Sequence, residues 1–133
     1  MHIRAMIATH PKVIGPVGEA LIHCIEECYT CAQTCAACAD ACLAEEAIAT
    51  LRNCIRLNLD CADICLATAS IASRQAGNNT VVLRKTIEAC AIACRLCAEE
   101  CMVHAPIHKH CGICAEECRA CERACNQALA SVH

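Results

Sequence analysis

Large apolar side chains are scarce in this chain, and aromatic ones are nearly absent. Tyr29 is the single aromatic residue, since the sequence has no Trp and no Phe. No apolar run approaches the roughly 18 residues of a membrane-spanning helix, so we expect no membrane partner. The 11 Lys and Arg are balanced by 14 Asp and Glu and form no basic surface with interleaved aromatics, so we expect no nucleic-acid partner. An ordinary aliphatic and aromatic core is also excluded, and another residue type must fill the interior.

Cysteine is the abundant residue, with 18 in a chain of 133 residues. That length suits one domain covering residues 1–133. The N-terminal stretch holds only a short apolar piece, at residues 5–8, and no small-residue cleavage site, so it lacks the pattern of a secretory signal. We therefore expect a cytoplasmic protein. In a reducing compartment, a high cysteine density indicates metal or redox chemistry rather than disulfides.

The cysteines recur with alternating steps of three and four residues, which is the pattern of a helix face packed inside a bundle. Most of the residues between them, Ala, Leu, Glu and Arg, are strong helix formers. The first ladder alone, from Cys24 to Cys42, corresponds to five turns and about 27 Å of helix. Four such ladders are present: Cys24, Cys28, Cys31, Cys35, Cys38, Cys42; Cys54, Cys61, Cys65; Cys90, Cys94, Cys97, Cys101; and Cys111, Cys114, Cys118, Cys121, Cys125.

Helix-breaking residues separate the ladders. Pro11 to Gly18 divides a short helical segment, at about residues 2–12, from the first long helix. The sequence Gly77-Asn78-Asn79-Thr80 predicts the end of the second helix and the polar cap of the third, and Pro106 ends the third. No Gly or Pro lies between Cys42 and Cys54, but one helix over residues 17–76 would be about 90 Å long, so we predict a reversal at residues 43–47.

Short connections between long amphipathic helices predict an all-α fold, an up-down antiparallel four-helix bundle with a short extra N-terminal helix and a core lined by Cys. One end of this core is expected to be an apolar plug of Val17, Leu21, Ala72, Leu83, Ile87, Ala128 and Val132. The other end is expected to be a mouth at which Cys42, Cys54 and Cys111 meet His104, His108 and His110. Asn58 occupies a position in phase with the cysteines of its helix and is a candidate metal contact or a hydrogen-bond partner of a ligand.

The motif C-x-E-E-C begins at Cys24, Cys97 and Cys114. Its two carboxylates follow the first Cys by two and three residues, so they point largely away from the thiol face. We therefore expect the Glu pairs to lie on solvated helix faces.

Neighbouring thiols at these spacings can share a soft metal ion between two sulfurs. One Cu(I) per thiolate is electrically neutral, so an array of such pairs can occupy a dry core at little electrostatic cost. Zinc held by four thiolates leaves two negative charges at each site, and it usually takes tetrahedral ligands from loops. Cu(I) is therefore favoured, in multiple ions and at roughly one per Cys. No catalytic residue is predicted, and we do not expect an enzyme.

Other interpretations remain open. Cys could simply replace Ala in a small-residue core, or form disulfides, although parallel thiols on one helix have poor disulfide geometry. A di-iron enzyme needs E-x-x-H, and no His here follows a Glu by three residues. An iron–sulfur electron carrier is an alternative that lacks the usual C-x2-C-x2-C-x3-C run. A zinc-buffering protein like metallothionein is the second alternative function.

The Cys ladders from Cys24 to Cys125, together with His104, His108 and His110, resemble the bacterial copper storage proteins, a family of Cys-lined four-helix bundles. The resemblance covers nearly the whole chain and is closest to the cytosolic subgroup. It implies Cu(I) loaded inside the bundle, assembly into a homotetramer, and a role in copper storage or in protection against copper excess. The copper donor and recipient stay unknown.

Overall fold

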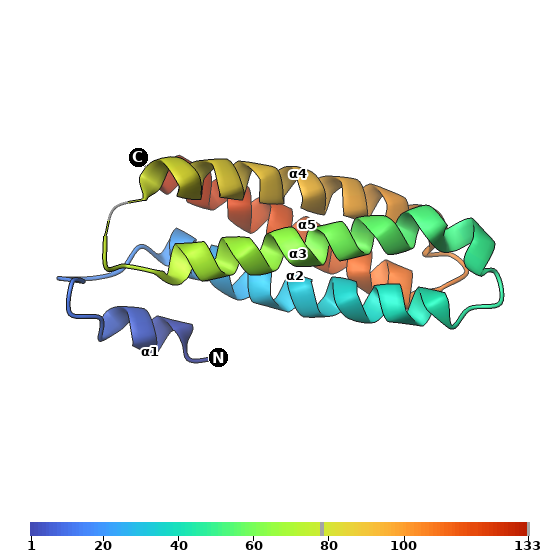
Figure 1. Cartoon of the computed structure of the whole chain (residues 1–133), viewed down its shortest axis with the longest axis horizontal. Helices are drawn as coiled ribbons and strands as arrows, with labels where there is room; N and C mark the ends of the chain where they lie inside the picture. The colour runs from blue at the N-terminus through green and yellow to red at the C-terminus, as the bar shows by residue number, and fades with distance from the viewer. Residues whose placement is uncertain (78, 133) are drawn as a thin grey trace.

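A computed structural model describes residues 1–77 and 79–132 of the chain (Figure 1). The predicted turn residue Asn78 and the terminal His133 lie outside the described residues. The elements in chain order are α1 (Ile3–Ala8), α2 (Glu19–Leu43), the 3-10 helix η1 (Ile48–Leu51), α3 (Arg52–Ser73), α4 (Thr80–His104) and α5 (Lys109–Ser131). The predicted all-α fold is confirmed for the described part of the chain.

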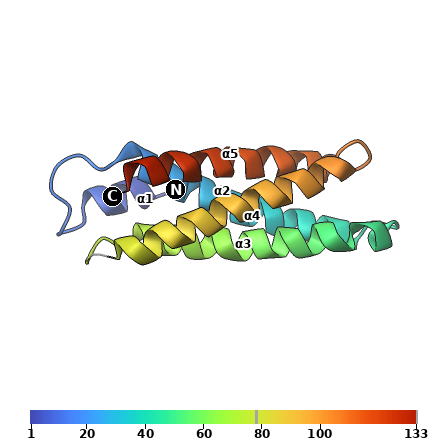
Figure 2. The same cartoon turned by 90° about the horizontal axis from the view of Figure 1, so that it is seen from above.

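The four long helices form an up-down bundle. α2 packs against α3 and α5, and α4 also packs against α3 and α5, so each helix has two neighbours (Figures 1 and 2). The end of α5 lies near the α3–α4 connection and the start of α2, whereas the α2–η1 turn lies at the opposite end (Figure 1). Consecutive helices are therefore antiparallel, as short connections require.

The connections agree with the predicted breaks in most respects. α2 ends at Leu43 within the predicted reversal, and α4 ends at His104 just before Pro106. α3 ends at Ser73, followed by an extended Arg74, so Gly77 lies beyond the helix end rather than capping it. Asn79 occupies the N-cap position of α4, as predicted, but its side chain makes no capping hydrogen bond.

The N-terminal helix is shorter than the predicted segment at residues 2–12. α1 covers Ile3–Ala8, and the Thr9 hydroxyl donates a hydrogen bond to the Ala5 carbonyl 2.7 Å away. The helix ends before Pro11 because helical backbone angles are disfavoured for a residue that precedes proline. Ile7 is buried against the core, and Arg4 pairs with Glu19 at the start of α2. α1 therefore packs against the four-helix bundle.

The predicted apolar plug is present where α2 and α4 begin and α3 and α5 end. Ile87, Ala72 and Ala128 are buried, and Val17, Leu21 and Leu83 pack against the core from half-buried positions. Val132 is half-buried beyond the end of α5. At this end the ladders stop at Cys24, Cys65, Cys90 and Cys125, and mostly apolar side chains fill the core beyond them.

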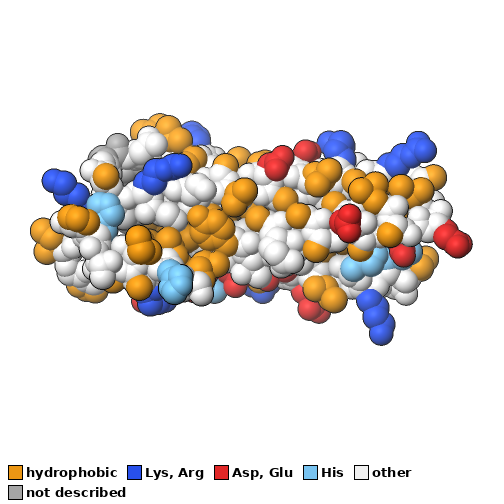
Figure 3. Space-filling model, turned by 60° about the horizontal axis from the view of Figure 1, so that its bottom comes forward, with side chains coloured by type: hydrophobic (Ala, Val, Ile, Leu, Met, Phe, Trp, Pro, Cys, Tyr) orange, Lys and Arg blue, Asp and Glu red, His pale blue; other side chains and the backbone are white. Residues whose placement is uncertain are grey.

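The face of the molecule seen in Figure 3 carries charges of both signs dispersed among apolar side chains. Within the described residues, none of the helices combines the length and the hydropathy that a bilayer crossing requires.

Candidate metal centre

The bundle directs every cysteine inward. All eighteen Cys side chains are free and buried. The alternating three- and four-residue steps keep each thiol on the side of its helix that faces the bundle axis, because 3.5 residues is close to one helical turn. The structure thus brings together all the cysteines that the sequence singled out.

The sulfur atoms lie close together, both between neighbouring helices and along one helix. The Sγ atoms of Cys35 and Cys118 are 3.5 Å apart across α2 and α5, and those of Cys65 and Cys90 are 3.6 Å apart across α3 and α4. On one helix, Cys31 and Cys35 lie 3.7 Å apart. These distances are shorter than twice a metal–sulfur bond of about 2.3 Å, so one ion can join two such sulfurs in a bent arrangement, whereas a linear arrangement requires the sulfurs to move apart.

The ligand atoms form overlapping groups in which all members lie within 4.8 Å of one another. Shared residues link the groups: Cys121 belongs to two of them, and so do Cys31, Cys35 and Cys118. Five of these groups are Cys28, Cys90, Cys121, Cys125; Cys31, Cys65, Cys94, Cys121; Cys31, Cys35, Cys61, Cys118; Cys35, Cys97, Cys114, Cys118; and Cys38, Cys42, His110, Cys111. The first four groups, which share residues, make a continuous row of potential metal positions, and the fifth group lies at the histidine end.

Burial keeps two thiols at the histidine end, those of Cys42 and Cys111, neutral. Removal from water raises the pKa of the Cys42 thiol and the pKa of the Cys111 thiol above the usual value near 9, because a dry interior disfavours the thiolate. The metal-free thiols therefore pack as small, weakly polar side chains. A bound cation replaces the proton, so metal binding and proton release are coupled.

Asn58 is the one amide in the row of thiols. Its side chain is fully buried, and Nδ2 donates to the Cys54 carbonyl 2.9 Å away. Its Oδ1 accepts from the Cys114 thiol at 2.9 Å and from the Cys97 thiol at 3.3 Å. The amide thus connects α3 to α4 and α5. Its oxygen lies where it can hydrogen-bond a thiol or contact a metal ion held by the sulfurs.

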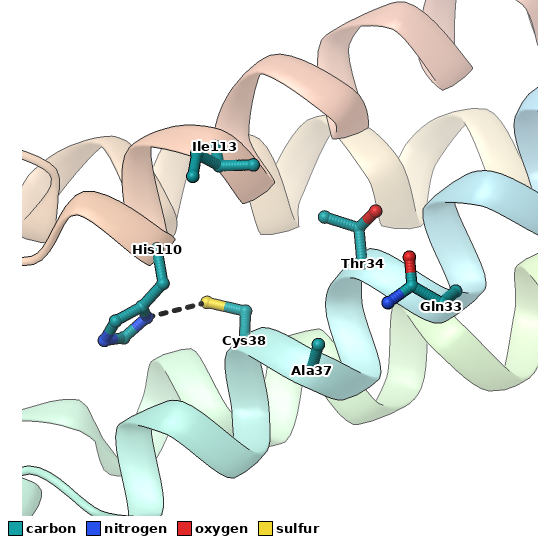
Figure 4. A pocket seen from close by; sticks show the side chains of 6 residues that line it. All are labelled: Gln33, Thr34, Ala37, Cys38, His110 and Ile113. Atoms are coloured by element: carbon teal, nitrogen blue, oxygen red, sulfur yellow. Dashed lines mark hydrogen bonds between the residues drawn. The ribbon is translucent and has the colours of Figure 1, made fainter.

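The three predicted mouth histidines lie at the α4–α5 turn, but they have different partners. The Nδ1 atom of His110 lies 3.4 Å from Cys38 Sγ (Figure 4). It also lies 3.6 Å from Cys111 Sγ. The rings of His108 and His110 stack with centroids 5.6 Å apart. His104 instead contacts a carboxylate, with its Nε2 3.4 Å from Glu100 Oε1. The structure therefore brings His110 directly to the thiols.

Glu45, in the turn after α2, is a residue of this end that the sequence did not single out. Its carboxylate contacts Nδ1 of His108, and it lies 3.8 Å from Nε2 of His110. A carboxylate that takes one ring N–H leaves the other ring nitrogen free for a metal, which is the common arrangement beside metal-binding histidines. No spacing signal could have found Glu45, because it lies on a different connection from the histidines it contacts.

The expectation of solvated Glu pairs is wrong for Glu27 and Glu117. Both are half-buried, and the Oε2 atom of each is buried without a hydrogen-bond partner among the described residues. Burial, and then the nearby Glu27 carboxyl, raise the pKa of Glu117 to about 9. α2 and α5 pack closely enough to cover the flanks of both helices, which the helical phase alone does not reveal. Glu99 and Glu116 are exposed, as expected.

Comparisons with known proteins agree with this geometry. The family model of copper storage proteins matches residues 17–130. Among curated proteins, no sequence matches this chain. The copper storage protein Ccsp from Streptomyces lividans, in a structure loaded with 10 copper equivalents, is 50% identical and superposes with a TM-score of 0.92. That alignment covers 96% of this chain and 98% of the Ccsp chain.

A second structure is described as a cytosolic copper storage protein from Streptomyces lividans with five coppers. It is 54% identical, with a TM-score of 0.83, over 84% of this chain and 93% of that one. The family model spans nearly all of α2 to α5, and these helices carry every cysteine of the metal-binding row. This chain belongs to the copper storage protein family.

Proposed function

We propose that this chain stores Cu(I) in the cytosol by holding many ions on the thiolates inside its four-helix bundle, at roughly one ion per Cys. The observation that carries the proposal is the row of overlapping groups of buried ligand atoms, each within 4.8 Å of the others in its group. A structural core does not need such a row, because Ala would fill the same positions without a reactive group.

Charge and ligand type favour Cu(I) as the stored ion. Thiolates are soft ligands that select Cu(I), and one Cu(I) neutralises one thiolate, so the loaded interior gains no net charge. The described core offers no cation that could balance the excess negative charge of zinc tetrathiolate sites, since its buried residues are Cys, Ala, Ile and Leu side chains, Asn58 and Thr68. The related Ccsp structures, which are described as loaded with copper, support copper as the stored metal.

The proposed ligands are the eighteen cysteines, with His104, His108 and His110 at the mouth and Asn58 as an additional contact or hydrogen-bond partner. His110 has the strongest support of the three histidines because its Nδ1 already faces two sulfurs. We propose a storage role without catalysis, which protects the cell against copper excess. Residues 1–133 act as one domain in this proposal.

We also propose that the chain assembles into a homotetramer, as the family resemblance implies. Support comes from an apolar groove between α3 and α4 lined by Leu57, Ile64, Ile92 and Leu96 among other residues. A groove of this kind is costly to leave in water. Light scattering coupled to size-exclusion chromatography of the metal-free protein tests the proposal, and a monomer at micromolar concentration contradicts it.

Anaerobic titration of the fully reduced protein with Cu(I) tests the storage function. We expect tight, colourless binding of roughly one equivalent per thiol, measured by competition with a chromophoric Cu(I) chelator and by metal analysis after desalting. Binding of only one or two equivalents contradicts the proposal. A brown product after reconstitution with iron and sulfide would support the electron-carrier alternative, and retention of zinc in the presence of excess Cu(I) would support the zinc-buffer alternative.

A further inference from the structure

The sulfurs of the row lie in layers across the bundle, and each layer takes one position from each long helix. Between Sγ atoms, Cys28 on α2 lies 3.7 Å from Cys90 on α4 and 3.8 Å from Cys121 on α5. Cys65 on α3 lies 3.6 Å and 4.0 Å from the same two sulfurs. All four long helices therefore contribute a sulfur to this layer.

The layer beyond it, towards the apolar plug, contains the last Cys of α2 and of α5 at this end. Three or four residues make about one helical turn, so one such step along each helix reaches the next layer. The step leads to Cys24 on α2, Thr68 on α3, Ile87 on α4 and Cys125 on α5. All four side chains are buried, and the Sγ atoms of Cys24 and Cys125 lie 3.8 Å apart. This layer therefore holds two sulfurs rather than four.

Thr68 is a buried polar residue in that layer. Within the described residues, Asn58 and Thr68 are the buried polar side chains other than the thiols, and both lie in phase with the cysteines of α3. The Thr68 hydroxyl donates to the Ile64 carbonyl 2.7 Å away, and the Thr86 carbonyl of α4 lies 3.5 Å from it. The hydroxyl hydrogen is thus used by the backbone. The hydroxyl oxygen is a hard ligand, which Cu(I) does not favour.

We propose that Thr68 ends the copper row on α3 and thereby limits the number of ions that the bundle stores. The inference rests on the proposed storage function. A sulfur at position 68 would join Cys24 and Cys125 in the last layer, where Cys24 also lies 4.0 Å from Cys28. Around a planar three-coordinate ion with metal–sulfur bonds of about 2.3 Å, the sulfurs lie about 4.0 Å apart, so the spacing in this layer suits a further sulfur ligand.

Ile87 is the other residue of the last layer without sulfur, but it belongs to the apolar plug. Its side chain is one of the largest that are fully buried, so replacement by Cys would leave a cavity. Thr and Cys differ little in volume, so an exchange at position 68 changes the ligands with little change in packing. The Ile64 carbonyl also keeps its helical N–H partner when the hydroxyl is removed. Position 68 is therefore where the length of the row can be changed without disturbing the fold.

Thr68→Cys tests the inference by adding one thiol to the last layer. The matched control is Ala72→Cys, which adds a thiol at a similarly buried position of the same helix, one layer further into the plug. Thr68→Val removes the hydroxyl and adds no thiol. Each variant is loaded anaerobically with excess Cu(I) and desalted, and native mass spectrometry counts the ions bound per chain.

We expect T68C to bind about one copper ion more than the wild type, because each added thiolate in reach of other sulfurs neutralises one further Cu(I). T68V and A72C should bind the wild-type number. The far-ultraviolet circular dichroism of all three metal-free variants should match that of the wild type.

The wild-type number of ions in T68C, an equal gain in A72C, or the loss of an ion in T68V overturns the role of Thr68. Loss of the metal-free fold in T68C also overturns it, because the inference requires that position 68 accept a thiol. Uptake of only one or two ions by the wild type instead overturns the storage function, so the two failures are distinguishable.

Discussion

The half-buried carboxyls of Glu27 and Glu117 show how one residue can work against the fold that contains it. Their buried Oε2 atoms lack hydrogen-bond partners among the described residues, and burial raises the pKa of Glu117 to about 9. A carboxyl with an ordinary pKa in the unfolded chain and a raised pKa in the folded chain stabilises the fold at low pH and loses that contribution as pH rises. For Glu117, this contribution to stability is lost as the pH rises from about 4.5 to about 9.

Glu117→Gln should therefore stabilise the metal-free protein, and more at pH 7.5 than at pH 5, because the amide carries no charge to desolvate. We expect an increase of about 3 °C or more in the melting temperature at pH 7.5, since about 1 kcal/mol shifts a domain of this size by several degrees. Circular dichroism melting curves at both pH values measure the effect. The control is Glu116→Gln, at an exposed position. Equal effects of the two variants would contradict the assignment.

Glu45 is expected to orient the mouth histidines. Because its carboxylate accepts the Nδ1 proton of His108, its replacement should release that ring to the Nε2–H tautomer that free imidazole prefers. Nitrogen-15 NMR of histidine-labelled protein distinguishes the two tautomers directly. We expect the change in Glu45→Ala, a partial return in Glu45→Gln, and none in Glu46→Ala at the adjacent exposed position. An unchanged His108 spectrum in Glu45→Ala would show that the contact has no orienting role.

The long helices combine two properties that are usually in conflict. Their inner faces are reactive, since they carry the thiols, and they are also the faces that hold the bundle together. Thiols satisfy both needs because, when protonated, they pack like small apolar groups. The helices are thus expected to form without metal, and the spacing of ligands is set before copper arrives.

Replacement of Cys31, Cys94 and Cys118 by Ser tests this at the level of the helices. Each lies in the middle of a different helix, and together they belong to three of the four-sulfur groups. We expect Cu(I) capacity to fall by about the number of thiols removed, while the far-ultraviolet circular dichroism of the metal-free variant stays that of the wild type. Loss of helicity without metal would mean that the thiols are needed for folding itself.

The whole molecule couples protons, copper and stability. Burial raises the pKa of Cys42 and of Cys111, so the folded metal-free protein holds protons that the unfolded chain releases at alkaline pH. Stability from these groups is complete below the unfolded thiol pKa of about 8.5 and is lost as pH rises toward their folded values. Copper replaces the same protons, and a ligand that binds only the folded state stabilises it further.

The metal-free protein should therefore melt at progressively lower temperatures above about pH 8.5, and the copper-loaded protein should not. Removal of copper by a strong Cu(I) chelator should restore the alkaline sensitivity. Melting curves from pH 7 to pH 10 with and without Cu(I) measure both effects. Equal pH dependence of the two forms would contradict proton displacement as the basis of loading.

The sequence by itself determined the helices, their inward faces and the soft-metal chemistry. The steps between cysteines fix the phase of each thiol on its own helix, and phase is a local property that needs no knowledge of neighbours. The end of α4 was predictable for the same reason, because Pro106 acts locally, whereas the end of α2 followed from the excessive length of an unbroken helix over residues 17–76.

Only the tertiary structure decided which features of different helices meet. The contact of Glu45 with His108 and the burial of Glu27 and Glu117 each involve side chains from separate elements. Such contacts depend on the distance and rotation between packed helices, which residue spacing along one chain segment does not contain. The sequence therefore specifies what the core can bind, and the packing of the helices decides which side chains of different helices meet around it.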